Sequence, residues 1–109
     1  PMKVRTIFNA CHFSAEKMQK MNLFATNELC LDVYCLEPGQ DQRVHKHEAS
    51  SKIYIVLEGH GRFHIGQEVK EVGPGQAVLA RAGEMHGVAN TTMERLVLLV
   101  SIAPPPQHP

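Results

Sequence analysis

The sequence has no excess of either charge, because 11 Lys and Arg residues balance 11 Asp and Glu residues. Nucleic-acid-binding proteins usually carry a basic excess or a basic stripe, and neither is visible here. The chain also lacks a long apolar run, since the longest, over residues 96–100, is far too short to cross a bilayer. We therefore expect neither a nucleic-acid partner nor an association with membranes.

Cysteine is scarce: Cys11, Cys30 and Cys35 are the only three, and none of them forms a CxxC pair. Cys30 and Cys35 fall in one candidate strand at an odd spacing, so their side chains point to opposite faces and cannot bridge each other locally. We expect no signal peptide at the start of the chain. These features are typical of a protein of the reducing cytoplasm.

Internal repeats and linkers are absent too, and 109 residues with 43% apolar content suit one compact core. We expect a single domain over residues 1–109. Its last part, residues 103–109, is a proline-rich tail that cannot donate a ladder of sheet hydrogen bonds.

Most of the sequence consists of short candidate strands separated by turn residues. They cover residues 3–8, 28–36, 44–47, 52–57, 62–65, 69–72, 77–80, 85–89 and 95–102. Ser14 is a candidate N-cap for one short helix over residues 15–21, with Glu16 in its first turn. The pattern predicts an all-β sandwich or barrel with one short N-terminal helix.

The run over residues 96–100 shows no alternation of apolar and polar residues, so we expect both faces of that strand to be buried. In a single small sandwich one face would be open to water. A second layer or a partner chain must cover it, and this predicts a homodimer.

His45 and His47 stand two residues apart in a candidate strand, so both imidazoles leave the same face. Two imidazoles side by side suit a transition metal, although such a pair alone is equally typical of solvated histidines. The glycines around the pair and a third histidine downstream favour the metal site over solvated histidines.

Together these residues resemble the two conserved motifs of the cupin superfamily, G(X)5HXH(X)3,4E(X)6G and G(X)5PXG(X)2H(X)3N. The matching residues are Gly39, His45, His47 and Gly59 in the first motif and Gly75, Gly83, His86 and Asn90 in the second. The resemblance covers about residues 30–102. It implies an RmlC-like jelly roll, a double-stranded β-helix, with a divalent metal on His45, His47 and His86. It also implies that Asn90 shapes the turn and strand behind His86.

Two positions depart from the motifs: Lys52 replaces the glutamate ligand of the first, and Arg81 replaces the proline of the second. Three neutral imidazoles can still hold zinc, iron, nickel, copper or cobalt. Glu48 is an alternative oxygen ligand if the strand bends. In a competing interpretation the histidines hold no metal, and the interior binds a small molecule or nothing.

A charged Lys52 beside a divalent ion would be costly. At about 5 Å and an effective dielectric near 20, the repulsion is about 6–7 kcal/mol. Removing the lysine proton at pH 7 costs only about 4–5 kcal/mol. The side chain should therefore lose its proton, pair with Glu48 or turn toward the barrel mouth, and we expect it to turn away.

The leading functional hypothesis is a metal-dependent enzyme, of oxygenase or isomerase type, acting on a small polar or anionic substrate. Lys52 and Tyr54, which share one face of their strand, are the candidate catalytic residues. Arg81 is a candidate substrate contact. The alternative is a cupin module that binds metal or a small molecule without turnover, because the fold hosts both classes.

Overall fold

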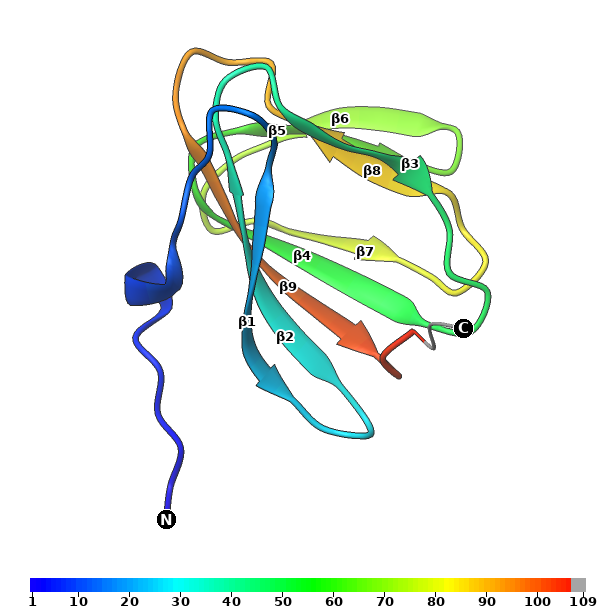
Figure 1. Ribbon diagram of the computed structural model, residues 1–109. Helices are drawn as coiled ribbons and strands as arrows, with labels where there is room; N and C mark the ends of the chain where they lie inside the picture. The colour runs from blue at the N-terminus through cyan, green and yellow to red at the C-terminus, as the bar shows by residue number, and fades with distance from the viewer. Residues whose placement is uncertain (107–109) are drawn as a thin grey trace.

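The protein consists of two antiparallel β-sheets packed face to face (Figure 1). The structure is a computed structural model that describes residues 1–106. Its elements are η1 (Ile7–Ala10), β1 (Gln19–Ala25), β2 (Cys30–Leu36), β3 (Asp41–His45), β4 (Ser51–Glu58), β5 (Gly61–Ile65), β6 (Glu68–Val72), β7 (Ala77–Ala80), β8 (His86–Ala89) and β9 (Leu96–Ala103). One sheet has the order β1-β2-β9-β4-β7 and the other β3-β8-β5-β6. The all-β prediction is confirmed.

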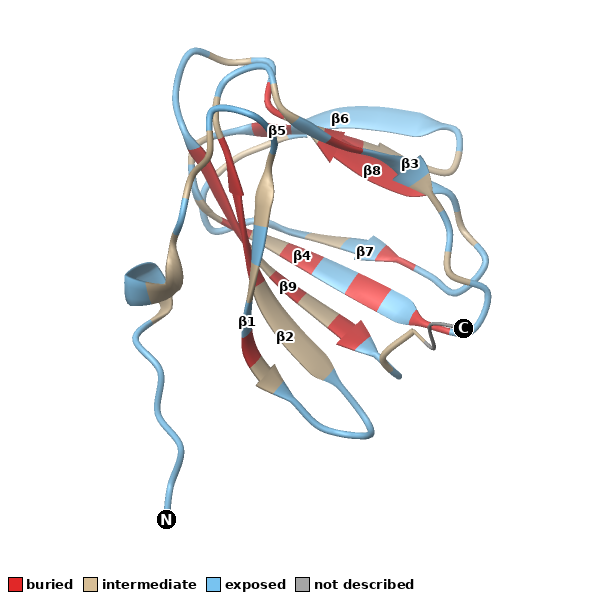
Figure 2. Cartoon of the chain, in the orientation of Figure 1, coloured by how far each residue is buried: buried red, intermediate tan, exposed pale blue. Residues whose placement is uncertain are grey.

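The main core lies between the two sheets and follows the period-2 pattern of the strands. In β4, burial alternates strictly over the first residues, so Lys52, Tyr54 and Val56 face inward while Ile53 faces outward (Figure 2). Tyr54 packs edge-on against Phe63 of the opposite sheet, with ring centroids 5.1 Å apart. The alternation of one strand thus carries the candidate residue Lys52 into the interior.

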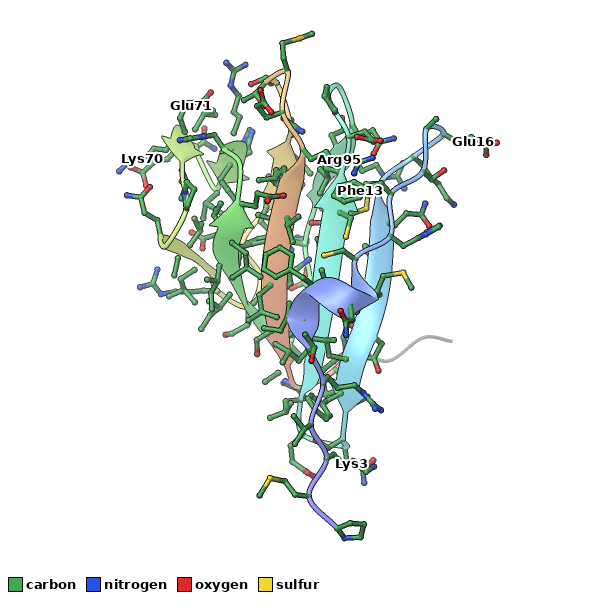
Figure 3. The ribbon with its side chains drawn as sticks, turned by 90° about the vertical axis from the view of Figure 1, so that its left-hand side faces the viewer. Lys3, Phe13, Glu16, Lys70, Glu71 and Arg95 are labelled. Carbon is green, nitrogen blue, oxygen red and sulfur yellow. The ribbon has the colours of Figure 1, made fainter. Side chains whose placement is uncertain are left out.

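A second core covers the outer face of β1, β2 and β9. Its buried centre is formed by Leu23, Val33, Cys35 and Val97, and the N-terminal residues Ile7, Ala10, Cys11 and Phe13 pack over it. The segment that carries η1 crosses this face, and Phe13 lies beside Arg95 (Figure 3). Both faces of β9 are therefore largely buried, as predicted, but the covering layer comes from the same chain. The run over residues 96–100 requires no partner chain.

The sequence-based assignment of the N-terminal region is wrong in two places. Residues 3–8 form no strand, and the only helical turn in residues 1–106 is η1, a 3-10 turn upstream of the predicted helix. Ser14 does accept a hydrogen bond from the backbone of Glu16, at 3.2 Å, but the chain bends there. Residues 19–25 then pair with β2. A helix this short is marginal alone, and sheet pairing overrides it.

No helix within residues 1–106 is long and apolar enough to span a membrane. Of the proline-rich tail predicted over residues 103–109, residues 107–109 lie outside the described part of the chain.

Candidate metal centre

The pairing of β3 with β8 brings two of the predicted ligands together. A bulge between Gln42 and His45 shifts the register, so that His45 lies directly opposite His86. Their ring centroids are 4.4 Å apart. Gly87 makes this close pairing possible, because a Cβ there would stand 2.8 Å from the backbone oxygen of Gln42.

His47 reaches the same point from the loop after β3, since the strand predicted over residues 44–47 ends at His45. The loop is held by a hydrogen bond of 2.8 Å from the Gly83 N–H to the carbonyl oxygen of His47. Gly83 adopts φ +81°, which favours glycine. The ring centroid of His47 lies 5.0 Å from that of His45 and 5.7 Å from that of His86.

The three imidazoles fit a single metal ion. One ring nitrogen of each of His45, His47 and His86 lies within 4.8 Å of the corresponding atoms of the other two. The Nδ1 atoms of His45 and His86 contact the backbone oxygens of Arg43 and Glu84, at 2.8 Å and 2.9 Å. These contacts orient the rings and leave Nε2 free for a ligand, as in known metal sites. The Nε2 atom of His86 is buried and has no hydrogen-bond partner among residues 1–106.

Electrostatics favour the neutral form of the rings, which is the form that binds metal. Burial lowers the pKa of His86 to about 4, with Lys52 and the other two histidines adding to the effect. Burial also lowers the pKa of His45, and Lys52 and Lys20 contribute. Two of the three rings are therefore ready for metal without releasing a proton at neutral pH.

Lys52 stays inside the barrel, so the expectation that it turns toward the mouth is wrong. Its side chain is only 2% exposed. The ammonium nitrogen lies 4.9 Å from the ring centroid of Tyr54 and 5.2 Å from that of Tyr34. Burial, with a smaller contribution from Lys20, lowers the pKa of Lys52 to about 7. Of the three expected outcomes, this position therefore favours loss of the Lys52 proton.

Gln42, on β3, connects Lys52 to its surroundings. When its carboxamide oxygen faces the lysines, that oxygen accepts hydrogen bonds from Lys52 and Lys20, both at 3.2 Å. The amide nitrogen then donates to the Tyr54 hydroxyl at 2.7 Å. This orientation gives both lysines an acceptor on Gln42. In the opposite one the oxygen accepts from the Tyr54 hydroxyl at 2.7 Å, but the amide N–H groups are set against both ammonium groups. Burial raises the pKa of Tyr54 above its usual range, so its hydroxyl keeps its proton.

Glu48 and Arg81 are both exposed, and Glu48 is not one of the residues grouped around the candidate metal position. The carboxylate of Glu48 is exposed and pairs with Lys46 at 3.0 Å. Arg81 is exposed as well, and its backbone N–H donates to Glu84. Its side chain lines a groove of about 360 Å³ beside β6 and β7, and none of the three histidines lines that groove.

Asn90 has the structural role that the motif implies. It is buried, and its side-chain nitrogen donates to the carbonyl oxygens of Leu36 and Glu94, at 3.1 Å and 2.7 Å. The side-chain oxygen accepts from Thr92. Asn90 thereby fixes the turn after β8, the strand that begins with His86.

Sequence reasoning missed three residues of this site: Gln42, Lys20 and Gly87. The strand period places residue 42 on the face opposite His45, and only the bulge brings both inward. Lys20 lay in the wrongly predicted helix. Gly87, directly after His86, was the one visible signal, because a glycine inside a strand often marks a close backbone approach.

Comparison with known proteins identifies the family to which the chain is similar. The family model described as the cupin domain matches residues 32–102. The oxalate-binding protein of Thermotoga maritima is 34% identical over 67 residues, which are 62% of this chain and 55% of that protein. The chain thus spans about half the length of this curated relative.

Solved structures agree with the match. The crystal structure of a Thermus thermophilus protein has a TM-score of 0.94 and 39% identity, covering 96% of this chain and 100% of its own. A Thermotoga maritima protein described as a predicted oxalate decarboxylase has a TM-score of 0.75 and 26% identity, over 79% of each chain. With its two antiparallel sheets and its paired histidine motifs, the chain belongs to the cupin family.

Proposed function

We propose that the protein binds one divalent transition-metal ion on His45, His47 and His86. The supporting observation is the buried Nε2 atom of His86, which has no protein partner among the described residues and faces two further imidazoles. A buried polar atom without a partner is costly, and a metal ion would satisfy it. Zinc, iron, nickel, copper and cobalt all accept imidazole ligands.

Elemental analysis of protein purified without a histidine tag tests this proposal. We expect close to one metal ion per chain in the wild type and almost none in His86→Ala. His64→Ala is the matched control, because His64 lies on β5 and its Nε2 already contacts the carbonyl oxygen of Gly66 at 3.0 Å. Equal metal content in the wild type and His86→Ala would overturn the site.

We further propose that the centre acts on a small polar or anionic molecule. A bound ion supplies Lewis-acid chemistry, or redox chemistry if it is iron. Around it, Tyr54 offers a protonated hydroxyl and Lys52 an amine whose pKa of about 7 suits proton transfer at neutral pH. These two residues are the proposed catalytic groups, and Arg81 is the proposed contact to the distal end of a substrate.

Oxalate is the first ligand to test, because a curated relative is named for binding it. Calorimetry on the metal-loaded protein measures oxalate binding, and release of carbon dioxide measures turnover. Binding with turnover that is lost in Lys52→Met supports the enzyme. Binding without turnover of oxalate or related acids favours the alternative, a non-catalytic binding module.

We also propose that the protein forms a homodimer and that it is located in the cytoplasm. Ile53 and Leu79, paired on the outer face of β4 and β7, are 42% and 43% exposed, so apolar surface remains for a second copy. The three cysteines carry free thiols, which suits a reducing compartment. Light scattering at micromolar concentration checks the mass, and a monomer only would exclude the dimer.

A further inference from the structure

A cavity of about 500 Å³ adjoins the candidate metal centre through His47. Three parts of the chain line it: Asn27 in the turn between β1 and β2, residues 46–50 after β3, and residues 104–106 after β9. His47 belongs both to this lining and to the group of three histidines. The cavity therefore offers space for a ligand beside the proposed metal position.

The segment after β9 forms one wall of this cavity and is fixed to the domain. β9 ends at Ala103, which pairs with Ser51 at the start of β4. The hydroxyl of the buried Ser50 donates a hydrogen bond of 2.6 Å to the carbonyl oxygen of Pro104. The end of β9, the start of β4 and the end of β3 lie at the same end of the molecule (Figure 1). The wall is thus held against the loop that carries His47.

Most of this wall is apolar and rigid. Three consecutive prolines, residues 104–106, line the cavity together with Ala49. Proline has no backbone N–H and loses little side-chain entropy on folding, so this surface is already formed before a ligand arrives. Proline-rich segments commonly pack against aromatic rings. The wall therefore favours a flat apolar group.

The charged residues of the lining compensate each other. Within residues 1–106, Lys46 and Glu48 are the only Lys, Arg, Asp or Glu side chains that line the cavity, and they form an ion pair at 3.0 Å. A second carboxylate of a ligand would meet the apolar wall and the negative charge of Glu48, and placing an unpaired charge there is costly. The cavity thus favours a ligand with one anionic group over a diacid.

We propose that this cavity is the subsite for the ring of an aromatic monocarboxylic acid whose carboxylate is bound at the three-histidine centre. Three histidine ligands leave coordination positions open for such a group. The ring then lies against the proline wall, beside His47. This inference rests on the proposed metal site for the carboxylate, whereas binding of the ring depends on residues 46–50 and 104–106.

Calorimetry with zinc and two monocarboxylic acids tests the subsite. Zinc is titrated first, and then benzoate or acetate is titrated into the zinc-loaded protein at pH 7. Both acids have one carboxylate, so the ring makes the difference between them. We expect benzoate to bind about tenfold more tightly than acetate or better, because the ring is removed from water.

A variant with Pro105→Ser and Pro106→Ser removes two half-buried rings of the wall. We expect it to lose most of the advantage of benzoate over acetate, while its zinc affinity and acetate affinity are kept. Pro74→Ser is the matched control, because Pro74 is an exposed proline in the turn between β6 and β7. It should keep the full advantage. Circular dichroism confirms that each variant is folded.

Two results would overturn the subsite and leave the metal site standing. One is normal zinc binding with equal affinity for benzoate and acetate in the wild type, a comparison that needs no variant. The other is an advantage of benzoate that is equally large in the wild type and in the double proline variant. Failure of the wild type to bind zinc would instead overturn the proposed function, and the subsite together with it.

Discussion

His45 and His86 lie directly opposite each other on β3 and β8, with ring centroids 4.4 Å apart. Residues that far apart in the sequence meet because a bulge in β3 adds a residue before His45, and because Gly87 lets the two backbones approach. The centre is therefore built by strand pairing more than by the spacing of the first two histidines, and its geometry should respond to changes in the backbone.

Gly87→Ala should damage the metal site without touching a ligand. The new methyl group would meet the backbone oxygen of Gln42 at 2.8 Å, so β3 must move and carry His45 away from His86. We expect zinc affinity to fall at least tenfold. Gly75→Ala is the control, since it has no atom within 4 Å of its added Cβ and lies in a turn. It should cost about 1 kcal/mol of stability through its positive φ but keep the zinc affinity.

Lys52→Glu should tighten metal binding, because it replaces a lysine that is only partly charged at pH 7 with an anionic oxygen ligand. Titration of zinc into the metal-free protein measures the change, and we expect at least a tenfold gain. Glu48→Gln should leave zinc affinity unchanged, since Glu48 is exposed and pairs with Lys46. Equal or weaker affinity in Lys52→Glu would mean that position 52 does not act on the ion.

The stability of the metal-free protein should rise with pH between about 7 and 10.5, and Lys52 is the cause. Its pKa is about 7 in the folded state and 10.5 in the unfolded chain. Between these values the unfolded state binds more protons, so raising the pH favours folding by at most about 1.4 kcal/mol per pH unit. The gain is lost as the pH falls toward 7.

Urea unfolding of the wild type and Lys52→Met at pH 7 and pH 9 isolates this contribution. We expect the wild type to gain more stability than Lys52→Met over this range. Identical pH dependence in the two proteins would show that Lys52 has an ordinary pKa in the folded state.

Phe13 should contribute to stability through the second core, far from the histidines. Its ring packs over β2 and β9 and lies under the Arg95 guanidinium, at 4.2 Å from the centroid (Figure 3). Phe13→Ala should cost about 1–3 kcal/mol in urea unfolding, less than a fully buried phenylalanine would. Phe8→Ala should cost much less, because Phe8 is largely exposed. Equal costs would argue against the N-terminal segment as a covering layer.

The features that depend on local physics could be predicted from the sequence. The period-2 pattern of β4 placed Lys52 and Tyr54 on the inner face, and the structure has both buried there. Gly59 and Gly83 predict turns in the sequence, and both adopt a positive φ in the structure, which favours glycine. The three histidines could be grouped because the spacings of both motifs survive in this chain.

The remaining features depend on contacts between segments that are distant in the sequence. Gln42 faces inward together with His45 because a bulge cancels the parity of the strand, and a bulge is set by the partner strand. Lys20 reaches the site because residues 19–25 pair with β2, against their local signal for a helix. The outer face of β9 is covered by the chain's own N-terminal segment. In each case a contact between segments distant in sequence outweighs a local preference, since local propensities are weak compared with sheet pairing and burial.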